Sequence, residues 1–214
     1  MLRNPRRRMR AAFFLATTAL SLTAMAAPAL AADPSPSTVC KPSTATFKQV
    51  FNRSPWYDVA SYVPSPAGNF EGQLTNWTLG SGSKLVSGNE TYYVGAATDR
   101  SSLSLGSAAV VTSAPICVGV DYPWMRFFFR NTGAGTATLK VEIRGVTPLG
   151  IVKSLITNSY TGSSSWKLSP RILLVDNLAA ILSTNGMTPV AFRFTPSGGN
   201  WQIDDVYVDP YRSR

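Results

Sequence analysis

The side chains best able to do chemistry in this chain are carboxylates, because the sequence contains no histidine. The chain therefore lacks the commonest general base and metal ligand, and a Ser-His or Cys-His pair is excluded. Glycoside hydrolysis needs only two carboxylates, about 5–10 Å apart across the scissile bond. The acidic residues available for such a pair are Asp58, Glu71, Glu90, Asp99, Asp121, Glu142 and Asp205. No local motif pairs any two of them, so the sequence favours binding over catalysis.

Aromatic residues between the predicted strands are the main candidates for ligand contact. A sugar ring presents an apolar face that stacks on tryptophan or tyrosine, while its hydroxyls meet carboxylates and amides. The candidates are Trp56, Tyr57, Tyr92, Tyr93, Trp124 and Trp166, together with Phe128, which stands between Arg126 and Arg130 on a strand. The alternative is that the loop rings cover one end of the core and that a loop covers Phe128. Trp77 and Trp201, each beside aliphatic residues, are predicted to be core residues.

Residues 1–31 have the pattern of a cleaved signal peptide. A cluster of arginines is followed by an uncharged, apolar run from Ala11 to Ala32 that ends in small residues. A membrane anchor is the alternative, because this run almost reaches the length that spans a bilayer. The run is rich in Ala, Thr and Ser, however, and Pro28 interrupts it, so we expect export without a lasting membrane span. Residues 32–44 then form an extended Pro/Ser-rich leader, and residues 45–214 form one domain.

Cleavage of the signal peptide changes the charge of the chain. The full sequence has 20 Lys and Arg against 11 Asp and Glu, and loss of the five arginines of the signal leaves 15 against 11, or about +4. The remaining chain has no run of basic residues that could follow a phosphate backbone, so nucleic-acid binding is not supported. The mild positive charge suits association with anionic cell-wall polymers, and it equally serves solubility.

The chain contains two cysteines, Cys40 and Cys117. In a chain sent to an oxidising compartment, two cysteines predict a disulfide, and two free thiols are the alternative. The bridge would fix the N-terminal segment to a strand near Cys117.

From Thr44 onward, short apolar stretches alternate with turns rich in Gly, Asn, Ser and Pro, the rhythm of an all-β, antiparallel sandwich. The strictest alternation is in residues 139–144, LKVEIR, where aliphatic and charged residues occupy opposite faces. We expect this strand to pair with residues 125–130 across the turn NTGAG, and residues 190–194 to pair with residues 201–208 across PSGGN. Residues 171–183 fit either a short helix or a strand followed by a loop.

Two distant segments, NFEG followed by WTL at residues 69–79 and WQIDDVYV at residues 201–208, carry a family resemblance. Together they resemble the first and last strands of jelly-roll carbohydrate-binding modules, which are galactose-binding-like domains. The resemblance extends over residues 45–211, although only these two ends match well. The C-terminal pattern WQIDDVYVDPY is also similar to that of a set of secreted bacterial proteins. The resemblance implies a sandwich of jelly-roll type that binds a glycan.

The resemblance also implies a structural calcium ion between neighbouring first and last strands. Glu71 would supply one carboxylate, and Asp205 or Asp204 another. Strand alternation agrees, because if Trp201 and Ile203 point inward then Asp205 does too, and a buried carboxylate needs a partner. The alternative is a hydrogen-bonded carboxylate or a salt bridge with Arg126 or Lys48.

The sequence therefore predicts a secreted, non-catalytic module that binds glycan or a cell-envelope polysaccharide. An extracellular structural or protein-interaction domain without a sugar ligand is the alternative from another class. A small hydrolase with an unrecognised carboxylate pair is the third hypothesis.

Overall fold

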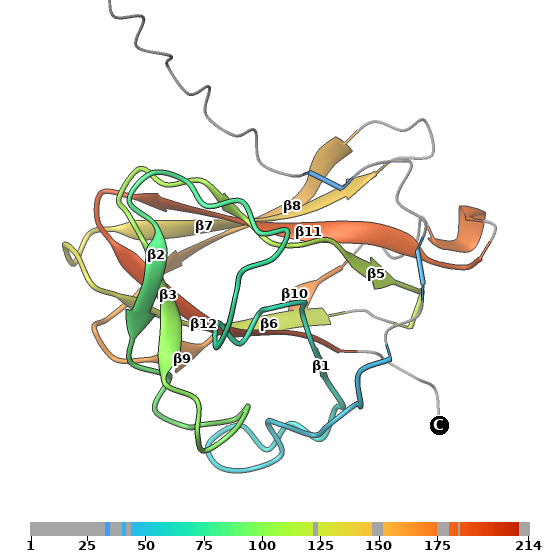
Figure 1. The fold of residues 1–214 in the computed structure, drawn as a ribbon, viewed down its shortest axis with the longest axis horizontal. Helices are drawn as coiled ribbons and strands as arrows, with labels where there is room; N and C mark the ends of the chain where they lie inside the picture. The colour runs from blue at the N-terminus through green and yellow to red at the C-terminus, as the bar shows by residue number, and fades with distance from the viewer. Residues whose placement is uncertain are drawn as a thin grey trace, which may run out of the picture.

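The computed structural model describes residues 33–34, 40–41, 44–121, 124–146, 152–174, 180–183 and 185–209. Two antiparallel sheets pack face to face in this part of the chain (Figure 1), which confirms the predicted all-β sandwich. The predicted signal peptide lies outside the described residues. Within them, no helix has the length and apolar character needed to cross a membrane.

The larger sheet comprises seven strands of the described chain, and β12 lies at its centre. In spatial order its main strands are β10 (Ile172–Leu173), β6 (Trp124–Asn131), β12 (Trp201–Asp209), β3 (Ser101–Leu105) and β2 (Lys84–Ser87). Two further strands extend it, because β1 (Val63–Pro64) also pairs with β12 and β9 (Lys167–Leu168) also pairs with β6. The pairing of β1 with β12 brings the first and last strands of the described chain together, but the NFEG and WTL segments of the resemblance follow β1 and form no strand of this sheet.

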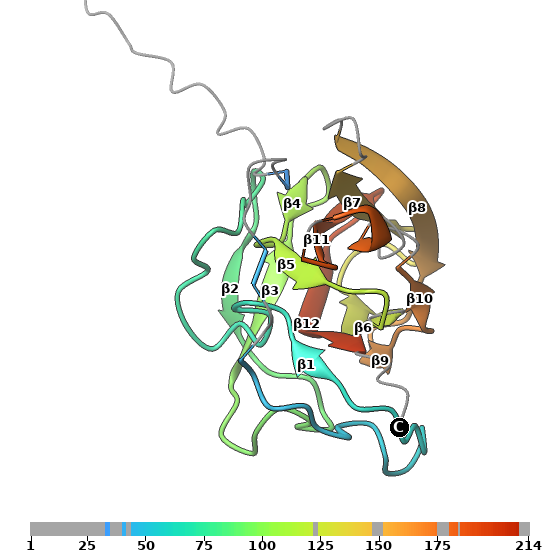
Figure 2. The ribbon, with the colours of Figure 1, turned by 90° about the vertical axis from the view of Figure 1, so that its right-hand side faces the viewer.

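The smaller sheet has β11 and β7 at its centre (Figure 2). Its strands are β4 (Val111–Thr112), β11 (Thr188–Ser197), β7 (Thr138–Val146) and β8 (Val152–Thr161), and β5 (Ile116–Val118) also pairs with β11. Inward residues of both sheets fill the core between them, and Trp77 and Trp201 are part of it, as predicted. In β7 the burial alternates along the whole strand, also as predicted.

Both predicted hairpins are wrong. The predicted partners β6 and β7 lie in different sheets, and so do β11 and β12. Each loop carries the chain from one sheet to the other, and such exchange between sheets is typical of a jelly roll. Alternation identifies the buried face of a strand but not its partner, because the inner faces of both sheets follow the same period of two. Among consecutive strands of the described chain, β7 pairs with β8 and β2 pairs with β3.

A second hydrophobic cluster covers the outer face of the larger sheet. Its buried members are Phe51, Tyr62, Val94, Phe128, Trp166 and Tyr207. Phe51 comes from the segment that precedes β1, and its ring contacts Phe128 of β6 and Tyr207 of β12 with centroids 6.1 and 5.6 Å apart. The N-terminal part of the domain therefore lies over the sheet.

Cys40 and Cys117 form the predicted disulfide. Because Cys117 lies in β5, the bridge connects the leader to the smaller sheet. In the region that fitted either a helix or a strand, β10 occupies residues 172–173 and a single 3₁₀ turn occupies residues 180–182, while residues 175–179 lie outside the described chain.

Candidate functional site

Two of the predicted aromatic residues meet in the structure, and each has another predicted ring as its neighbour in the chain. The rings of Trp56 and Tyr92, from segments far apart in the sequence, meet with centroids 4.6 Å apart. Tyr57 and Tyr93 are their chain neighbours, and the exposed fractions of Tyr57, Tyr92 and Tyr93 are 71, 37 and 48%. We call Trp56, Tyr57, Tyr92 and Tyr93 the aromatic patch.

Arg53 holds the two segments of the aromatic patch together. Its Nη2 donates to the carbonyl oxygens of Tyr92 and Tyr93 at 2.8 and 3.2 Å. Its own carbonyl accepts from the backbone N–H groups of Trp56 and Tyr57 at 3.0 and 3.1 Å. Sequence reasoning missed Arg53, because a side chain that bonds to distant carbonyls leaves no local motif.

The backbone of the patch is unusual at both of its most exposed rings. Tyr57 and Tyr93 adopt φ values of 49° and 50°, in the left-handed region that residues with a side chain rarely enter. Such conformations are energetically costly, and in folded proteins they cluster at sites of function. Glycine would adopt them more readily, yet the chain places a large aromatic side chain at each position.

The remaining candidate rings are not part of the patch surface. Phe128 is fully buried beneath it, with its centroid 5.5 Å from Trp56 and 5.7 Å from Tyr92. Trp166 is also buried, and the guanidinium of Arg130 lies 4.8 Å from its ring centroid. The expectation of exposed rings is therefore corrected for these two residues, because neighbouring segments cover them. Trp124 is half-buried in β6, where it pairs with Leu173 and Asp209.

Buried carboxylates shape the loop that carries Tyr92 and Tyr93. The two carboxylate oxygens of Glu90 accept from the backbone N–H groups of Val94, at 2.7 Å, and Tyr92. Asp204 of β12 accepts from the N–H groups of Glu90 and Asp205, at 2.8 and 2.9 Å. Burial raises the pKa of Glu90, and burial with the charge of Asp205 raises the pKa of Asp204 to about 9. These acids organise a loop rather than face a substrate.

Asp205 is buried, as predicted, but for a different reason. A bulge interrupts the pairing of β12 with β6 between Asp204 and Tyr207, and Asp205 adopts a φ of 47° there. The extra residue breaks the alternation, so Val206 enters the core after Ile203. The Oδ2 of Asp205 has no hydrogen-bond partner within the described chain. Burial, and then the charges of Glu90 and Asp99, raise the pKa of Asp205 to about 8.

The predicted calcium ligands are engaged in different ways. The Oε1 of Glu71 accepts from the N–H groups of Arg100 and Ser101 at 2.8 and 2.6 Å. Asp99, which the resemblance did not indicate, lies near Asp205 on the same side of Gly95. A Cβ added to Gly95 would lie 2.5 Å from Asp99 Oδ2 and 3.2 Å from Asp205 Oδ1, so both carboxylates surround this glycine. No three side chains of the His, Cys, Asp and Glu types converge as a metal site in the described segments. A cation here would therefore depend on Asp205, Asp99 and backbone oxygens.

Arg126 is committed to another carboxylate, so it is not the partner of Asp205. Its Nη1 donates to Asp58 Oδ2 at 2.8 Å, and Asp58 also accepts from Arg171 at 2.6 Å and from the Tyr62 hydroxyl at 2.7 Å. Burial raises the pKa of Asp58, but the hydrogen bonds from Arg171 and Tyr62 outweigh it and leave the pKa below its ordinary value. This network joins the covering segment to the larger sheet.

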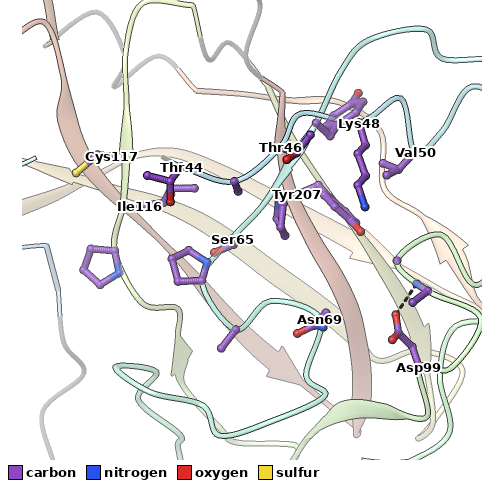
Figure 3. A pocket seen from close by; sticks show the side chains of 18 of the residues that line it. Thr44, Thr46, Lys48, Val50, Ser65, Asn69, Asp99, Ile116, Cys117 and Tyr207 are labelled. Carbon is purple, nitrogen blue, oxygen red and sulfur yellow. Dashed lines mark hydrogen bonds between the residues drawn. The ribbon is translucent and has the colours of Figure 1, made fainter. Parts of the chain in front are cut away.

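A pocket of about 830 Å³ borders the loop that carries Tyr92 and Tyr93, and Gly95 and Asp99 of this loop line it. Figure 3 shows Lys48 extending into it toward Tyr207, with Asp99 and Asn69 farther down. Ser65 also lines the pocket, and its buried hydroxyl has no partner in the described part of the chain. The loop of residues 90–99 thus has part of the aromatic patch near its beginning and this pocket near its end.

Comparison with known proteins gives distant structural likenesses. No protein-family model matches the sequence, and no curated protein matches it. TmCBM61, solved with β-1,4-galactotriose, is similar at 16% identity over 67% of this chain and 95% of that one, with a TM-score of 0.44. A family 11 carbohydrate-binding module from Clostridium thermocellum, solved with a mixed-linked tetrasaccharide, is similar at 17% identity over 68% and 95%, with a TM-score of 0.41.

The enzymatically active domain of tailspike protein 4 from bacteriophage CBA120 is also similar, at 19% identity over 68% of this chain, with a TM-score of 0.46. The chain spans only 21% of that protein. Most of the similar structures are carbohydrate-binding modules, the class that the two ends of the sequence resemble.

Proposed function

We propose that this protein is a secreted, non-catalytic module that binds glycan through the aromatic patch. The observation that carries the proposal is the ring contact between Trp56 and Tyr92, from two distant segments, with an exposed tyrosine next to each of them in the chain. Tyrosine and tryptophan suit a sugar ligand, because the aromatic ring stacks on the apolar face of the sugar. The tyrosine hydroxyl can then form hydrogen bonds with the hydroxyls of the sugar.

The surroundings support the patch as the binding surface. Trp56 and Tyr92 rest on the buried Phe128 of a central strand, and Arg53 holds both backbone segments through its hydrogen bonds. A surface held in this way loses little conformational entropy on binding, which favours affinity.

The carboxylates favour a non-catalytic role. A glycosidase needs one acid to protonate the leaving group and a second carboxylate to attack or activate water. In the described chain, Glu90 and Asp204 use both oxygens to bind backbone N–H groups, and Asp58 holds two arginines and a tyrosine. Carboxylates engaged in this way support the fold, and the bonds that they accept favour a structural role over a catalytic one.

We further propose that a structural calcium ion binds at Asp205 and Asp99, with Glu71 at its edge. The unpartnered, buried Oδ2 of Asp205 supports this site, because a hard cation would compensate a carboxylate that lacks a hydrogen-bond donor. The ion would neutralise the carboxylates beneath the loop of residues 90–99 and so fix the loop. The predicted signal peptide and the Cys40–Cys117 disulfide fit an exported protein, which meets calcium at high concentration.

A pull-down with insoluble polysaccharides tests the glycan proposal. We expect the purified protein to be retained on at least one neutral polysaccharide and a Tyr57→Ala, Tyr93→Ala variant to be lost from it. Leu182→Ala is the control, because it removes an exposed apolar side chain that is not part of the patch. Equal retention of the parent and the patch variant would overturn the proposal, and so would the absence of retention on every neutral polysaccharide.

A further inference from the structure

Two arginines on the outer face of the smaller sheet hold a carboxylate from the N-terminal leader. Arg144 donates from Nε to Asp33 Oδ1 at 3.0 Å and from Nη2 to Asp33 Oδ2 at 2.8 Å. Arg193 of the neighbouring strand donates from Nη2 to Asp33 Oδ1 at 2.8 Å. A bidentate guanidinium with a second guanidinium beside it is the strongest side-chain arrangement for recognising a planar carboxylate.

The two guanidinium groups are held in place by other partners. Arg144 Nη1 donates to Ser154 Oγ at 2.8 Å, and this hydroxyl donates to Glu142 Oε1 at 2.8 Å. Arg193 Nε donates to Thr112 Oγ1 at 3.3 Å. Because these bonds do not involve Asp33, the arginines have partners that would keep their orientation if Asp33 moved away. We call Arg144 and Arg193 the arginine clamp.

The face around the arginine clamp is charged and rich in hydroxyls. Lys140, Arg144 and Arg193 provide three positive charges, and Glu142 provides one negative charge on the same strands. Ser154 and Thr112 place hydroxyl groups against the clamp itself. This composition suits a ligand that presents a carboxylate together with hydroxyl groups, which is the chemistry of a uronic acid.

The position of Asp33 allows another carboxylate to replace it at the arginine clamp. Its side chain is 30% exposed, and it lies near the predicted cleavage site of the signal peptide. In Figure 1 the short blue segment of residues 33–34 lies on the outside of the sheet that contains β7 and β11. Cys40, bonded to Cys117 of the same sheet, keeps the leader nearby. A short tether gives an internal ligand a local concentration on the order of millimolar.

We propose that the arginine clamp is a binding site for the uronate carboxylates of an acidic polysaccharide and that Asp33 is its internal competitor. An external uronate would take the three hydrogen bonds that Asp33 now accepts, and its hydroxyls would meet Ser154. This site uses none of the residues of the aromatic patch, so it stands or falls independently of the proposed function.

The test compares a uronic-acid oligosaccharide with the same oligosaccharide after its carboxylates have been reduced to primary alcohols. Binding to each is measured by titration calorimetry for the parent, for Asp33→Asn, and for Asp33→Asn combined with Arg144→Gln and Arg193→Gln. If Asp33 occupies the clamp about nine-tenths of the time, Asp33→Asn strengthens uronate binding about tenfold, because the competent state becomes fully populated. The triple variant loses uronate binding, and no variant gains affinity for the reduced oligosaccharide.

Three outcomes would overturn the proposal: unchanged or weaker uronate binding by Asp33→Asn, retained binding by the triple variant, or equal gain for an aspartate-rich peptide. The last outcome would identify an acidic protein partner instead. Arg193→Gln in the Asp33→Asn background repeats the test with one guanidinium removed, in case the triple variant fails to fold. The Tyr57→Ala variant is the second control, because it changes neutral-glycan binding and leaves the response to Asp33→Asn intact.

Discussion

Gly133 and Gly199 lie in contact where the chain passes twice between the two sheets. A Cβ added to Gly133 would lie 2.9 Å from the Cα of Gly199 and 2.5 Å from the backbone nitrogen of Asn200. Beside this contact, the Thr132 N–H donates to the Asn200 carbonyl at 3.0 Å. The β6–β7 and β11–β12 connections therefore form one packed unit at the end of the sandwich.

We expect Gly133→Ala to lower the free energy of unfolding by roughly 1–3 kcal/mol, because its methyl group meets backbone that can move only by separating the two connections. Urea denaturation measures the change. Gly135→Ala is the matched control in the same loop, since a Cβ there has no atom within 4 Å. An equal loss of stability in both variants would contradict the packed contact.

Substitution of Tyr57 or Tyr93 by glycine distinguishes the energetic cost of the left-handed backbone from the contribution of the aromatic ring to glycan binding. Glycine accepts the left-handed conformation without strain but loses more entropy on folding, so we expect Tyr57→Gly and Tyr93→Gly to keep the free energy of unfolding within about 1 kcal/mol. Glycan binding should weaken at least about tenfold in each variant. Tyr57→Phe keeps the stacking surface and should retain most of the binding. A glycine variant that binds like the parent would remove Tyr57 or Tyr93 from the site.

Calcium should raise the melting temperature, and a chelator should reverse the increase. A site saturated at one hundred times its Kd adds about 2.7 kcal/mol of stability. Asp205→Asn should abolish the response by removing the carboxylate with the unpartnered oxygen, and Asp121→Asn should leave it intact. If the parent melts at the same temperature with calcium and with chelator, the calcium proposal is wrong.

The stability of the protein should depend on pH through Asp209. Burial, and then the charge of Asp58, raise its pKa from 3.8 to about 6. The folded state therefore holds this proton more tightly than the unfolded chain, and its contribution is fully present below pH 4 and lost as the pH rises through 6. Asp209→Asn should accordingly be more stable than the parent at pH 8, with a smaller difference at pH 4. Denaturation of both proteins across this range measures the effect, and a difference independent of pH would refute it.

Residue types and spacing predicted the faces of the strands better than their neighbours. Alternation placed Leu139, Val141 and Ile143 in the core correctly. The presence of two cysteines in a chain predicted to be exported was enough to predict the disulfide. Pairing failed because the connections at residues 132–137 and 198–200 can each close a hairpin or cross between sheets about 10 Å apart, and the sequence of the loop does not distinguish the two.

The candidate site was predicted in its composition but not in its arrangement. The loop aromatics were identified by type, and two of them, Trp56 and Tyr92, meet over Phe128 in segments that Arg53 joins, through tertiary contacts that no local pattern shows. Asp205 was expected to be buried by simple alternation, which the bulge interrupts. The arginine clamp binds Asp33, which is far from Arg144 and Arg193 in the chain, and no local sequence pattern relates the three residues.

The exchange of consecutive strands between the sheets has a consequence for folding. Because β6 and β7 belong to opposite sheets, as do β11 and β12, a fragment that contains either pair has no hairpin with which to begin. Apart from the β7–β8 and β2–β3 pairs, the strand pairing in each sheet joins distant parts of the chain, and such topologies fold in milliseconds to seconds rather than microseconds. The sandwich is therefore an all-or-none unit, and a cut in the loop at residues 132–137 would leave two pieces that need each other in order to fold.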